Sequence, residues 1–412
     1  MIKIYLFFTY IIYPFLFLFL RIRVLFNKEC PIRFKEKLGK INSNKCENVI
    51  WFHVASLGEI KSIHSIIKHY QKNKNLNILI TSVTQSSYEY FKENLKSHNT
   101  HHQYAPLDNP VIISKFLKNW KPKLSIFIES EIWPNMIMQT SKVSKIILLN
   151  CRISKKSFKK WRMFKTTFKN IMTKFDYILP QNDETLNFLK YFDLDKIKYI
   201  GNLKFIKIEK NNQNIIKIND SKNSWVAMSI HYEEINDIIE THLKVNEKIK
   251  NLTTYLIPRH LNKIDKIIKK IEYKKIQYQQ ISSNNFIKKF NGIVIIDKFG
   301  LAEDIFDQIK IVFMGGSFIE HGGQNPIEPL KYGCKVLSGE NIFNFAEIYN
   351  ELTNKKLAEL VNRKNLVNKL TNFLEKEDLN LKTNMKFDDY SVTIFNKTIK
   401  FLNSYILNEK NF

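Results

Sequence analysis

Acidic side chains follow two short apolar runs in the first half of the chain. Glu59 ends the segment HVASLGE, just beyond the run Val49–Val54. Glu129 and Glu131 stand one residue apart after the run Leu124–Ile128. A carboxylate in such a place could act as a general base, or it could cap a following helix by favouring the positive end of the helix dipole. The three acids are therefore candidates for proton transfer or charge stabilisation, with ordinary capping as the alternative.

Two cationic side chains stand in comparable places. Lys204 lies in the segment GNLK, directly before a long polar stretch, where it could meet an anionic leaving group. Arg259 lies in the segment PRH after another apolar run, and its guanidinium suits a phosphate or a carboxylate. Surface lysines and arginines are common, so each residue alone is a weak indication of a site.

The strongest local signal is a pair of glycine-rich segments. The first, MGGS, contains Gly316 and Ser317 and ends the run Ile311–Met314. The second, GGQNPIEP over residues 322–329, leads into a predicted helix whose first turn holds Glu328. Glycines allow close approach of a phosphate, free N–H groups at a helix start suit an anion, and Glu328 could accept hydrogen bonds from ribose hydroxyls. We interpret the pair as a nucleotide-binding element, with helix capping as the alternative for Glu328.

These residues need a scaffold that gathers strand ends, and the apolar runs supply one. Short runs rich in Ile, Val and Phe alternate with helical patterns, which is typical of βα units around a parallel sheet. The polar stretch Glu209–Lys222 reads as a linker. The sequence therefore predicts an α/β protein with two Rossmann-like parallel-sheet domains facing across a cleft, over residues 27–208 and 223–412. In such sheets ligands bind at the carboxyl ends of the strands, where the candidate residues lie.

The predicted strands fall into two series. In the first series they are Val49–Val54, Ile78–Val83, Leu124–Ile128, Ile146–Leu149 and Tyr177–Leu179. In the second series they are Trp225–Met228, Thr254–Ile257, Lys275–Tyr278, Ile293–Ile296, Ile311–Met314 and Lys335–Leu337. The tail from Asn362 to Phe412 has a helical and basic pattern.

The N-terminus predicts a membrane anchor over residues 1–26. The stretch Ile4–Leu20 is uncharged and nearly all apolar, at the short end of the ~17–25 residues that span a bilayer. Basic residues follow it, beginning at Arg21 and Arg23, and the positive-inside rule keeps them in the cytoplasm. A cleaved signal peptide is the rival interpretation, although no small-residue cleavage site follows. Insertion without spanning, around Pro14, also stays open.

The formal net charge of +26 favours polyanionic partners, which include nucleic acid, phospholipid headgroups and phosphorylated lipids. The stretch Arg152–Lys169 interleaves basic and aromatic residues, which suits an anionic membrane surface or, equally well, a solvated face. A membrane-tethered nucleic-acid-binding protein would explain the charge, but the chain has no recognisable module of that kind. The four cysteines lack CxxC spacing and indicate neither a zinc site nor a disulfide framework.

Taken in order, the motifs resemble those of the 3-deoxy-D-manno-octulosonic acid (Kdo) transferases of lipopolysaccharide biosynthesis, which belong to the GT-B class of glycosyltransferases. The match runs from the N-terminal anchor to about Phe345. It is carried by WFHVASLGE (51–59), ESEIWPN (129–135), NCRIS (150–154), PQNDE (180–184), GNLKF (201–205), PRH (258–260) and GGSFIEHGGQNPIEP (315–329).

The resemblance implies an inverting transfer of Kdo from CMP-Kdo to lipid IVA, a lipid A precursor, at the cytoplasmic face of a bacterial inner membrane. Glu59 is then the general base that removes the proton of the acceptor hydroxyl. Glu131 and Lys204 match the positions expected to stabilise the transition state. No metal ion, cofactor or nucleic acid is implied. The alternative is a membrane-associated GT-B enzyme that uses a UDP-sugar and a lipid acceptor, but this wider class does not generally share SLGE and ESEIWPN.

By the same resemblance the second domain binds CMP-Kdo. The residues assigned to the donor, including two from the first glycine segment, are Pro258, Arg259, Phe299, Gly300, Leu301, Gly316, Ser317, Asn325, Pro326, Ile327 and Glu328. Three positions depart from the family pattern. Leu301 replaces an acid, the loop at Tyr232 is one residue shorter, and Gln324 stands where histidine is usual.

Overall fold

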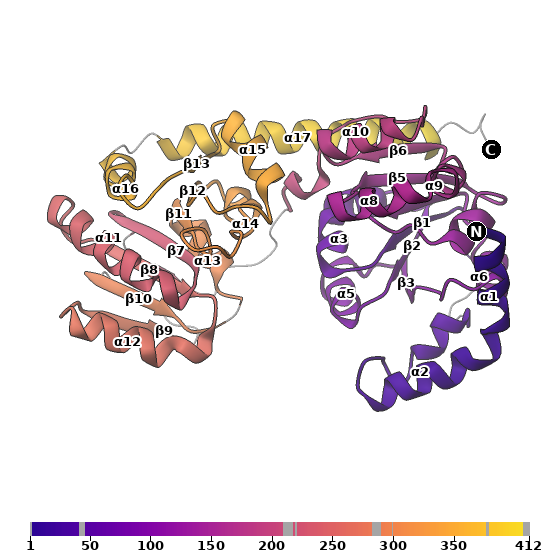
Figure 1. Cartoon of the computed structure of the whole chain (residues 1–412), viewed down its shortest axis with the longest axis horizontal. Helices are drawn as coiled ribbons and strands as arrows, with labels where there is room; N and C mark the ends of the chain where they lie inside the picture. Colours follow the sequence, from indigo (N-terminus) through magenta and orange to yellow (C-terminus); the bar gives the residue numbers. More distant parts are fainter. Residues whose placement is uncertain are drawn as a thin grey trace. The chain divides into compact units, whose positions relative to one another are not determined.

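The computed structural model describes residues 2–40, 46–208, 217–218, 221–281, 290–298, 300–375 and 379–406 (Figure 1). The chain divides into two compact units. Unit 1 comprises Met1–Ile208 and Val392–Phe412, and unit 2 comprises Glu209–Ser391. Each unit is an α/β body built on its own parallel sheet, as the alternating sequence pattern predicts.

The sheet of unit 1 has six parallel strands within the described residues, in the order β3-β2-β1-β4-β5-β6. The strands are β1 (Val49–Val54), β2 (Asn77–Ser82), β3 (Thr100–Tyr104), β4 (Leu124–Ile128), β5 (Lys145–Cys151) and β6 (Tyr177–Pro180). The helices after them are α3 (Leu57–Ser62), α4 (His64–Gln71), α5 (Gln85–Tyr90), α6 (Pro110–Trp120), α7 (Pro134–Thr140), α8 (Lys155–Met163), α9 (Lys165–Met172) and α10 (Asp183–Tyr191). Because β1 pairs with β2 on one side and β4 on the other, the carboxyl ends of β1 and β4 form the switch point at which such folds bind ligands.

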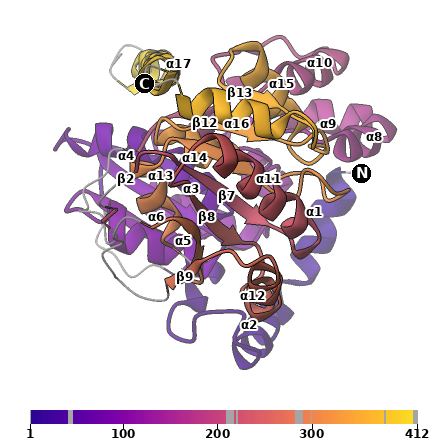
Figure 2. The ribbon, with the colours of Figure 1, turned by 90° about the vertical axis from the view of Figure 1, so that its left-hand side faces the viewer.

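The sheet of unit 2 has seven parallel strands in the described part of the chain, in the order β13-β12-β11-β7-β8-β10-β9. The strands are β7 (Ser224–Ile230), β8 (Thr253–Pro258), β9 (Tyr278–Ile281), β10 (Gly292–Ile296), β11 (Ile311–Met314), β12 (Lys335–Ser338) and β13 (Ala358–Leu360). The helices are α11 (Ile235–Lys248), α12 (Ile264–Tyr273), α13 (Ala302–Gln308), α14 (Ile327–Lys331), α15 (Ala346–Asn354), α16 (Leu366–Glu375) and the first part of α17 (Leu379–Ile406). Here the switch point lies between β7 and β11. Helices α11 and α16 pack side by side (Figure 2).

Most of the predicted strands are confirmed to within a residue or two at each end. The prediction Lys275–Tyr278 is wrong, because Lys275 adopts a left-handed φ of 54° in the turn after α12 and the strand begins only at Tyr278. Strands β3 and β13 were not predicted. Their sequences, THHQY and AEL, have no apolar run, and pairing with a neighbouring strand makes them part of the sheet.

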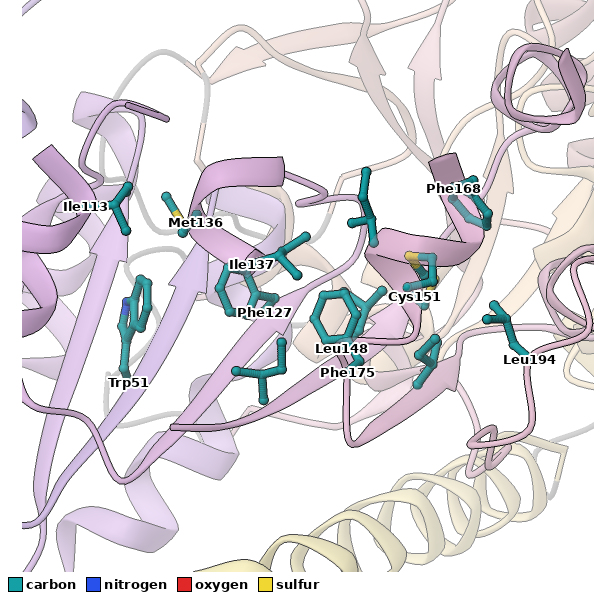
Figure 3. Packing of buried hydrophobic residues seen from close by; sticks show 14 of the residues in the cluster. Trp51, Ile113, Phe127, Met136, Ile137, Leu148, Cys151, Phe168, Phe175 and Leu194 are labelled. Carbon is teal, nitrogen blue, oxygen red and sulfur yellow. The ribbon is translucent and has the colours of Figure 1, made fainter. Parts of the chain in front are cut away.

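The core of unit 1 supports the carboxyl ends of its two central strands. Trp51 of β1 and Phe127 of β4 are fully buried, with ring centroids 5.3 Å apart, and Met136 and Ile137 of α7 join the same cluster (Figure 3). Every residue of β1 is buried. Large buried aromatic side chains contribute strongly to core stability. The segments that follow β1 and β4 therefore start from strands that are firmly packed in the core.

The N-terminal segment forms helices α1 (Ile2–Ile11) and α2 (Leu16–Leu25), separated by a short 3-10 turn at Tyr13–Phe15. Among the described helices, no single one is long and apolar enough to cross a bilayer. The bent pair Ile4–Ile11 and Tyr13–Leu25, with a 44° bend, meets the length and composition criteria together. The predicted anchor is thus a broken helix, and whether it enters a membrane stays a prediction.

The C-terminal helix α17 differs from the predicted domain boundary. The prediction placed residues 223–412 in one domain, whereas the part from Val392 onward belongs to unit 1. In that part Asn403 Oδ1 accepts a hydrogen bond of 2.9 Å from the Tyr70 hydroxyl, and Ile394 packs closely against Gly201. The pattern of the tail predicts a helix correctly, but it does not indicate which core the helix covers. Most of the predicted linker 209–222 lies outside the described residues.

Candidate active site

The acidic residues of the first half gather at the switch point of unit 1. Glu59 lies in α3, the helix that follows β1, while Glu129 and Glu131 lie in the loop that follows β4. Strands β1 and β4 are direct neighbours, so the two segments leave the sheet side by side. All three carboxylates are buried, each with no more than 8% of its surface exposed. A buried cluster of three acids requires compensating partners.

Glu59 makes the contacts of a helix-capping residue. Its Oε2 accepts a hydrogen bond of 2.7 Å from the amide of Ala55, and its Oε1 accepts one of 3.1 Å from the hydroxyl of Ser56. In return the Glu59 amide donates to Ser56 Oγ, so the N-cap residue Ser56 and Glu59 bond each other at the start of α3. These contacts agree with the capping alternative, and the role of Glu59 as general base stays a prediction.

The ionisation of Glu59 suits a base at neutral pH. The pKa of Glu59 is raised to about 7. Burial is the main cause and the negative charges of Glu129 and Glu131 add to it, while the hydrogen bonds from Ala55 and Ser56 act in the lowering direction. A general base works best when its pKa lies near the working pH, since it then combines an available charged form with useful basicity.

The other two acids have different partners. Lys204 Nζ lies 2.7 Å from Glu129 Oε1, and the role of Lys204 in stabilising the transition state stays a prediction. Glu131 Oε2 instead accepts a hydrogen bond of 2.6 Å from Trp133 Nε1 and lies 3.2 Å from His53 Nε2. Burial tends to raise the pKa of Glu131, but these contacts with His53 and Trp133 outweigh it and hold the pKa below its usual value. Glu131 is thus the acid that keeps its charge.

His53 is a site residue that the motifs do not single out. Its Nδ1 lies 2.9 Å from Thr81 Oγ1, which accepts a hydrogen bond of 2.8 Å from Trp51 Nε1. Trp51 Nε1 can only donate, so Thr81 Oγ1 accepts from it and we assign the Thr81 hydroxyl as donor to His53 Nδ1. The imidazole proton then lies on Nε2, the nitrogen that faces Glu131. A histidine within a wholly buried strand was the signal that could have found this chain of contacts.

Lys204 is held in place by two asparagines. Asn150 Oδ1 accepts a bond of 3.0 Å from the Leu203 amide, and Asn202 Oδ1 accepts one of 3.0 Å from the Lys204 amide. Asn150 has a left-handed φ of 59° and Glu129 one of 58°, which non-glycine residues rarely adopt. The ends of β4 and β5 therefore carry backbone strain at the place where the ion pair between Lys204 and Glu129 forms.

In unit 2 the first glycine segment binds a side chain of the protein itself. The amides of Gly316, Ser317 and Phe318 donate to the carboxylate of Glu234 over 2.7, 3.1 and 2.9 Å, and the amide of His231 donates to it as well, over 3.1 Å. Glu234 is completely buried. The amides of Gly316 and Ser317 are therefore occupied by Glu234, and a contact of these two residues with the donor stays a prediction.

The second glycine segment also differs from the expectation. Helix α14 has only 5 residues, and its first free amide, that of Ile327, donates to Asn325 Oδ1 over 3.2 Å. Pro326 has no N–H to offer, so this helix start is a poor anion site. The side chain of Glu328 is exposed and remains available to a ribose.

The remaining residues assigned to the donor lie in separate loops of unit 2. Pro258 is buried at the end of β8, whereas the side chain of Arg259 is exposed. Gly300 has a left-handed φ of 90° with open space around it, and Leu301 is buried at the start of α13. The side chain of Leu301 is thus packed into the protein, and Phe299 lies outside the described residues.

A cluster of histidines lies beside these loops. The His231 ring lies 4.1 Å from that of His321 and 5.6 Å from that of His260, measured between centroids. Burial, and then the neighbouring His321, lowers the pKa of His231. His231 Nε2 is buried and has no hydrogen-bond partner in the described part of the chain. In the part of the chain that the structure describes, no group of three or more His, Cys, Asp or Glu residues is arranged to hold a metal ion. Metal independence stays a prediction.

Comparisons of the sequence with known proteins point to one family of enzymes. A family profile described as 3-deoxy-D-manno-octulosonic-acid transferase (kdotransferase) matches residues 32–207. The chain is 29% identical to the 3-deoxy-D-manno-octulosonic acid transferase of Rickettsia bellii, over 98% of both chains. It is 33% identical to the enzyme of the same name from Rickettsia prowazekii, over 82% of this chain and 74% of the relative.

Among solved structures, the chain is similar to a glycosyltransferase from Rickettsia africae. The TM-score is 0.55 at 15% identity, covering 89% of this chain and 100% of that one. At this identity the likeness concerns the fold alone. The two parallel-sheet α/β units thus resemble those of GT-B glycosyltransferases.

Replacement of Glu59 separates its two roles. Glu59→Gln should lower the transfer rate by about 10²–10⁴-fold, because the general base is lost, with donor binding unchanged. Ser56→Ala is the matched control, since it removes the N-cap side chain, which costs roughly 1 kcal/mol of stability, but leaves the Glu59 carboxylate in place. Rates are compared with donor titrations. A glutamine variant that retains the wild-type rate would show that Glu59 acts only as a cap.

The pH profile tests the coupling between the acids. Activity should rise with pH through about 7 as Glu59 loses its proton. Glu129→Gln removes a neighbouring negative charge, so the pKa of Glu59 should fall and the rising limb of kcat/KM should move to lower pH. An unmoved limb, or a shift to higher pH, would contradict this coupling.

The four amides around Glu234 give a prediction about stability. Glu234→Ala leaves buried N–H groups without acceptors and should lower the free energy of unfolding by roughly 3 kcal/mol. The adjacent, exposed Glu233→Ala serves as the control and should change it little. Calorimetry of both variants measures the difference, and equal transition temperatures would argue against this role of Glu234.

Proposed function

The chain belongs to the 3-deoxy-D-manno-octulosonic acid transferase family, and on this premise we propose that it transfers Kdo from CMP-Kdo to lipid IVA with inversion at the anomeric carbon. The observation that carries the proposal is Glu59, a buried carboxylate with a pKa of about 7 at the switch point of unit 1. It meets the requirement of a base that must accept a proton from a sugar hydroxyl at neutral pH.

In the proposed reaction the acceptor hydroxyl gives its proton to Glu59 as its oxygen attacks the anomeric carbon of Kdo. The bond between that carbon and the phosphate oxygen breaks, and CMP leaves with the electron pair. The sugar gains positive charge in this step, so fixed negative charge nearby stabilises it. The lowered pKa of Glu131 supports that role for it, because Glu131 is ionised whenever Glu59 is ready to act.

Lys204 has a second role in this proposal. In the structure it is paired with Glu129 at 2.7 Å. This pair compensates the charge of Glu129 and so limits how far the pKa of Glu59 is raised. When a negatively charged substrate group approaches, the same ammonium can interact with it, since about three-tenths of the Lys204 side chain is exposed.

Unit 2 supplies the proposed contacts to the nucleotide. Arg259 carries an exposed guanidinium suited to the phosphate, and the exposed carboxylate of Glu328 suits the ribose hydroxyls. The loops of Gly300 and Asn325 add contacts through the backbone. His231 Nε2, buried and unpartnered among the described residues, supports a further polar contact in this region. In this proposal side chains supply the positive charge that stabilises the leaving phosphate, and no metal ion is required.

We further propose that the enzyme lies at the cytoplasmic face of a bacterial inner membrane. The outer surface of α1 supports this, because Ile4, Phe7 and Phe8 are each at least 60% exposed. Exposed apolar side chains of this density favour a lipid environment over water. Basic residues that follow, such as Arg21 and Arg23, favour anionic headgroups.

The proposal is tested by incubating the full-length protein with lipid IVA and CMP-Kdo and analysing the lipid by mass spectrometry. We expect products heavier by one or more Kdo residues, formed by the wild type but not by Glu59→Gln. UDP-sugars serve as competing donors in parallel reactions. Products formed only from a UDP-sugar would overturn the choice of donor, and unmodified lipid IVA in every reaction would overturn the choice of acceptor.

A further inference from the structure

Two polar side chains of helix α1 lie on the side that faces the protein. Tyr5 and Thr9, one helical turn apart, both make hydrogen bonds into unit 1, whereas Ile4, Phe7 and Phe8 on the other surface are exposed. This distribution is the reverse of that in a helix on a water-exposed surface. The helix is therefore attached to the rest of unit 1 by specific polar contacts, beside α6 (Figure 1) and also in contact with α7.

These contacts converge on a single carboxylate. The Tyr5 hydroxyl donates to Asp108 Oδ2 over 2.7 Å. Asp108 also accepts the amide of Asn135 over 3.1 Å and the amide of Met136 over 2.8 Å. These two amides belong to the first turn of α7, whose own N-cap residue makes no side-chain capping bond. Asp108 therefore caps α7 from outside and joins it to α1.

A second contact reinforces the first. The Asn135 side chain is completely buried and donates to Thr9 Oγ1 over 3.0 Å and to the carbonyl of Asp108 over 2.8 Å. Asn109 donates to the Thr9 carbonyl as well. The start of α7 is thus bonded to α1 directly, through Asn135 and Thr9, and indirectly, through Asp108 and Tyr5.

The loop directly before α7 carries the acid of the site. Only Ile132 and Trp133 separate Glu131 from the first residue of the helix, and Trp133 donates to Glu131 over 2.6 Å. The Ile132 amide is bonded to the Ser130 carbonyl, which makes the loop a tight turn. A displacement at the start of α7 is therefore passed to the Glu131 carboxylate over a short, hydrogen-bonded segment.

We propose that α1 is a positioning element for the active site, acting through Tyr5, Asp108 and Asn135 on the loop of Glu131. The inference rests on the proposed function for the meaning of Glu131, but the mechanical link is independent of it. Insertion of the apolar face of α1 into a lipid surface would then act on the same element that places Glu131. The N-terminal segment is in this view more than a tether, and its removal would take the Tyr5 bond from Asp108 and the Thr9 bond from Asn135.

The test uses three variants, Tyr5→Phe, Thr9→Val and the double variant that combines these two changes. Tyr10→Phe is the control, and all proteins are full-length and in the same detergent. Tyr10 lies on the exposed surface of α1 and is 60% exposed, so its variant controls for changes to the helix alone. We expect the double variant to lose about tenfold in kcat with the KM for CMP-Kdo unchanged, because misplacement of a catalytic group affects the reaction and not donor binding. Tyr10→Phe should match the wild type.

Hydrogen–deuterium exchange gives a readout that does not depend on turnover. Exchange in the peptide covering residues 131–140 should increase in the double variant, while the peptides of β1 and β2 stay protected. Unchanged exchange together with unchanged kcat would overturn the proposal. Should the double variant unfold, the single variant Thr9→Val, which keeps the Tyr5 bond, decides by the same measurements. Should the wild type transfer no Kdo, the exchange result alone decides, and the failure concerns the proposed function only.

Discussion

The active site depends on the burial of three carboxylates at the carboxyl ends of β1 and β4. Water cannot stabilise them there, so each requires a partner from the protein. Glu129 has Lys204, Glu131 has His53 and Trp133, and Glu59 has only the neutral donors of its own helix start. Glu131, which two side-chain N–H groups face, has a lowered pKa, whereas the pKa of Glu59, held only at its own helix start, is raised to about 7. The different partners of these two acids thus set them apart in ionisation.

Unit 2 solves the same physical problem for a structural purpose. Glu234 is as deeply buried as any acid in the described chain, yet four amides surround it. Hydrogen bonds to the charged form stabilise the carboxylate and hold together the ends of β7 and β11. The glycines of this loop are needed for close packing, since a Cβ at Gly315 would lie 2.6 Å from the Ser229 carbonyl oxygen. A glycine-rich segment after a strand can therefore serve an internal carboxylate and not a bound phosphate.

The hydrogen bonds of α1 connect the apolar N-terminus with this arrangement of charges. In water, an exposed apolar helix face has an unfavourable free energy, which a lipid environment removes. The inward polar face fixes the orientation of the helix on unit 1, so the same segment presents its apolar side chains outward and supports α7. The proposed contact with a lipid surface and the proposed positioning of the site thereby involve one structural element.

The sequence by itself determined the α/β class, most strands, and the segments that hold the candidate residues, because apolar periodicity and the punctuation of strands by small and acidic residues are local properties. It also identified Glu59 as a residue that could cap or catalyse. Only the tertiary structure decided that Lys204 pairs with Glu129 and that His53 lies directly beside Glu131. It likewise decided that the amides of Gly316 and Ser317 donate to Glu234. It also decided that α17 ends on unit 1 and that β3 and β13 are strands. These outcomes depend on contacts between residues far apart in the chain, and neither spacing nor composition contains the distances that set charge pairing, burial and pKa.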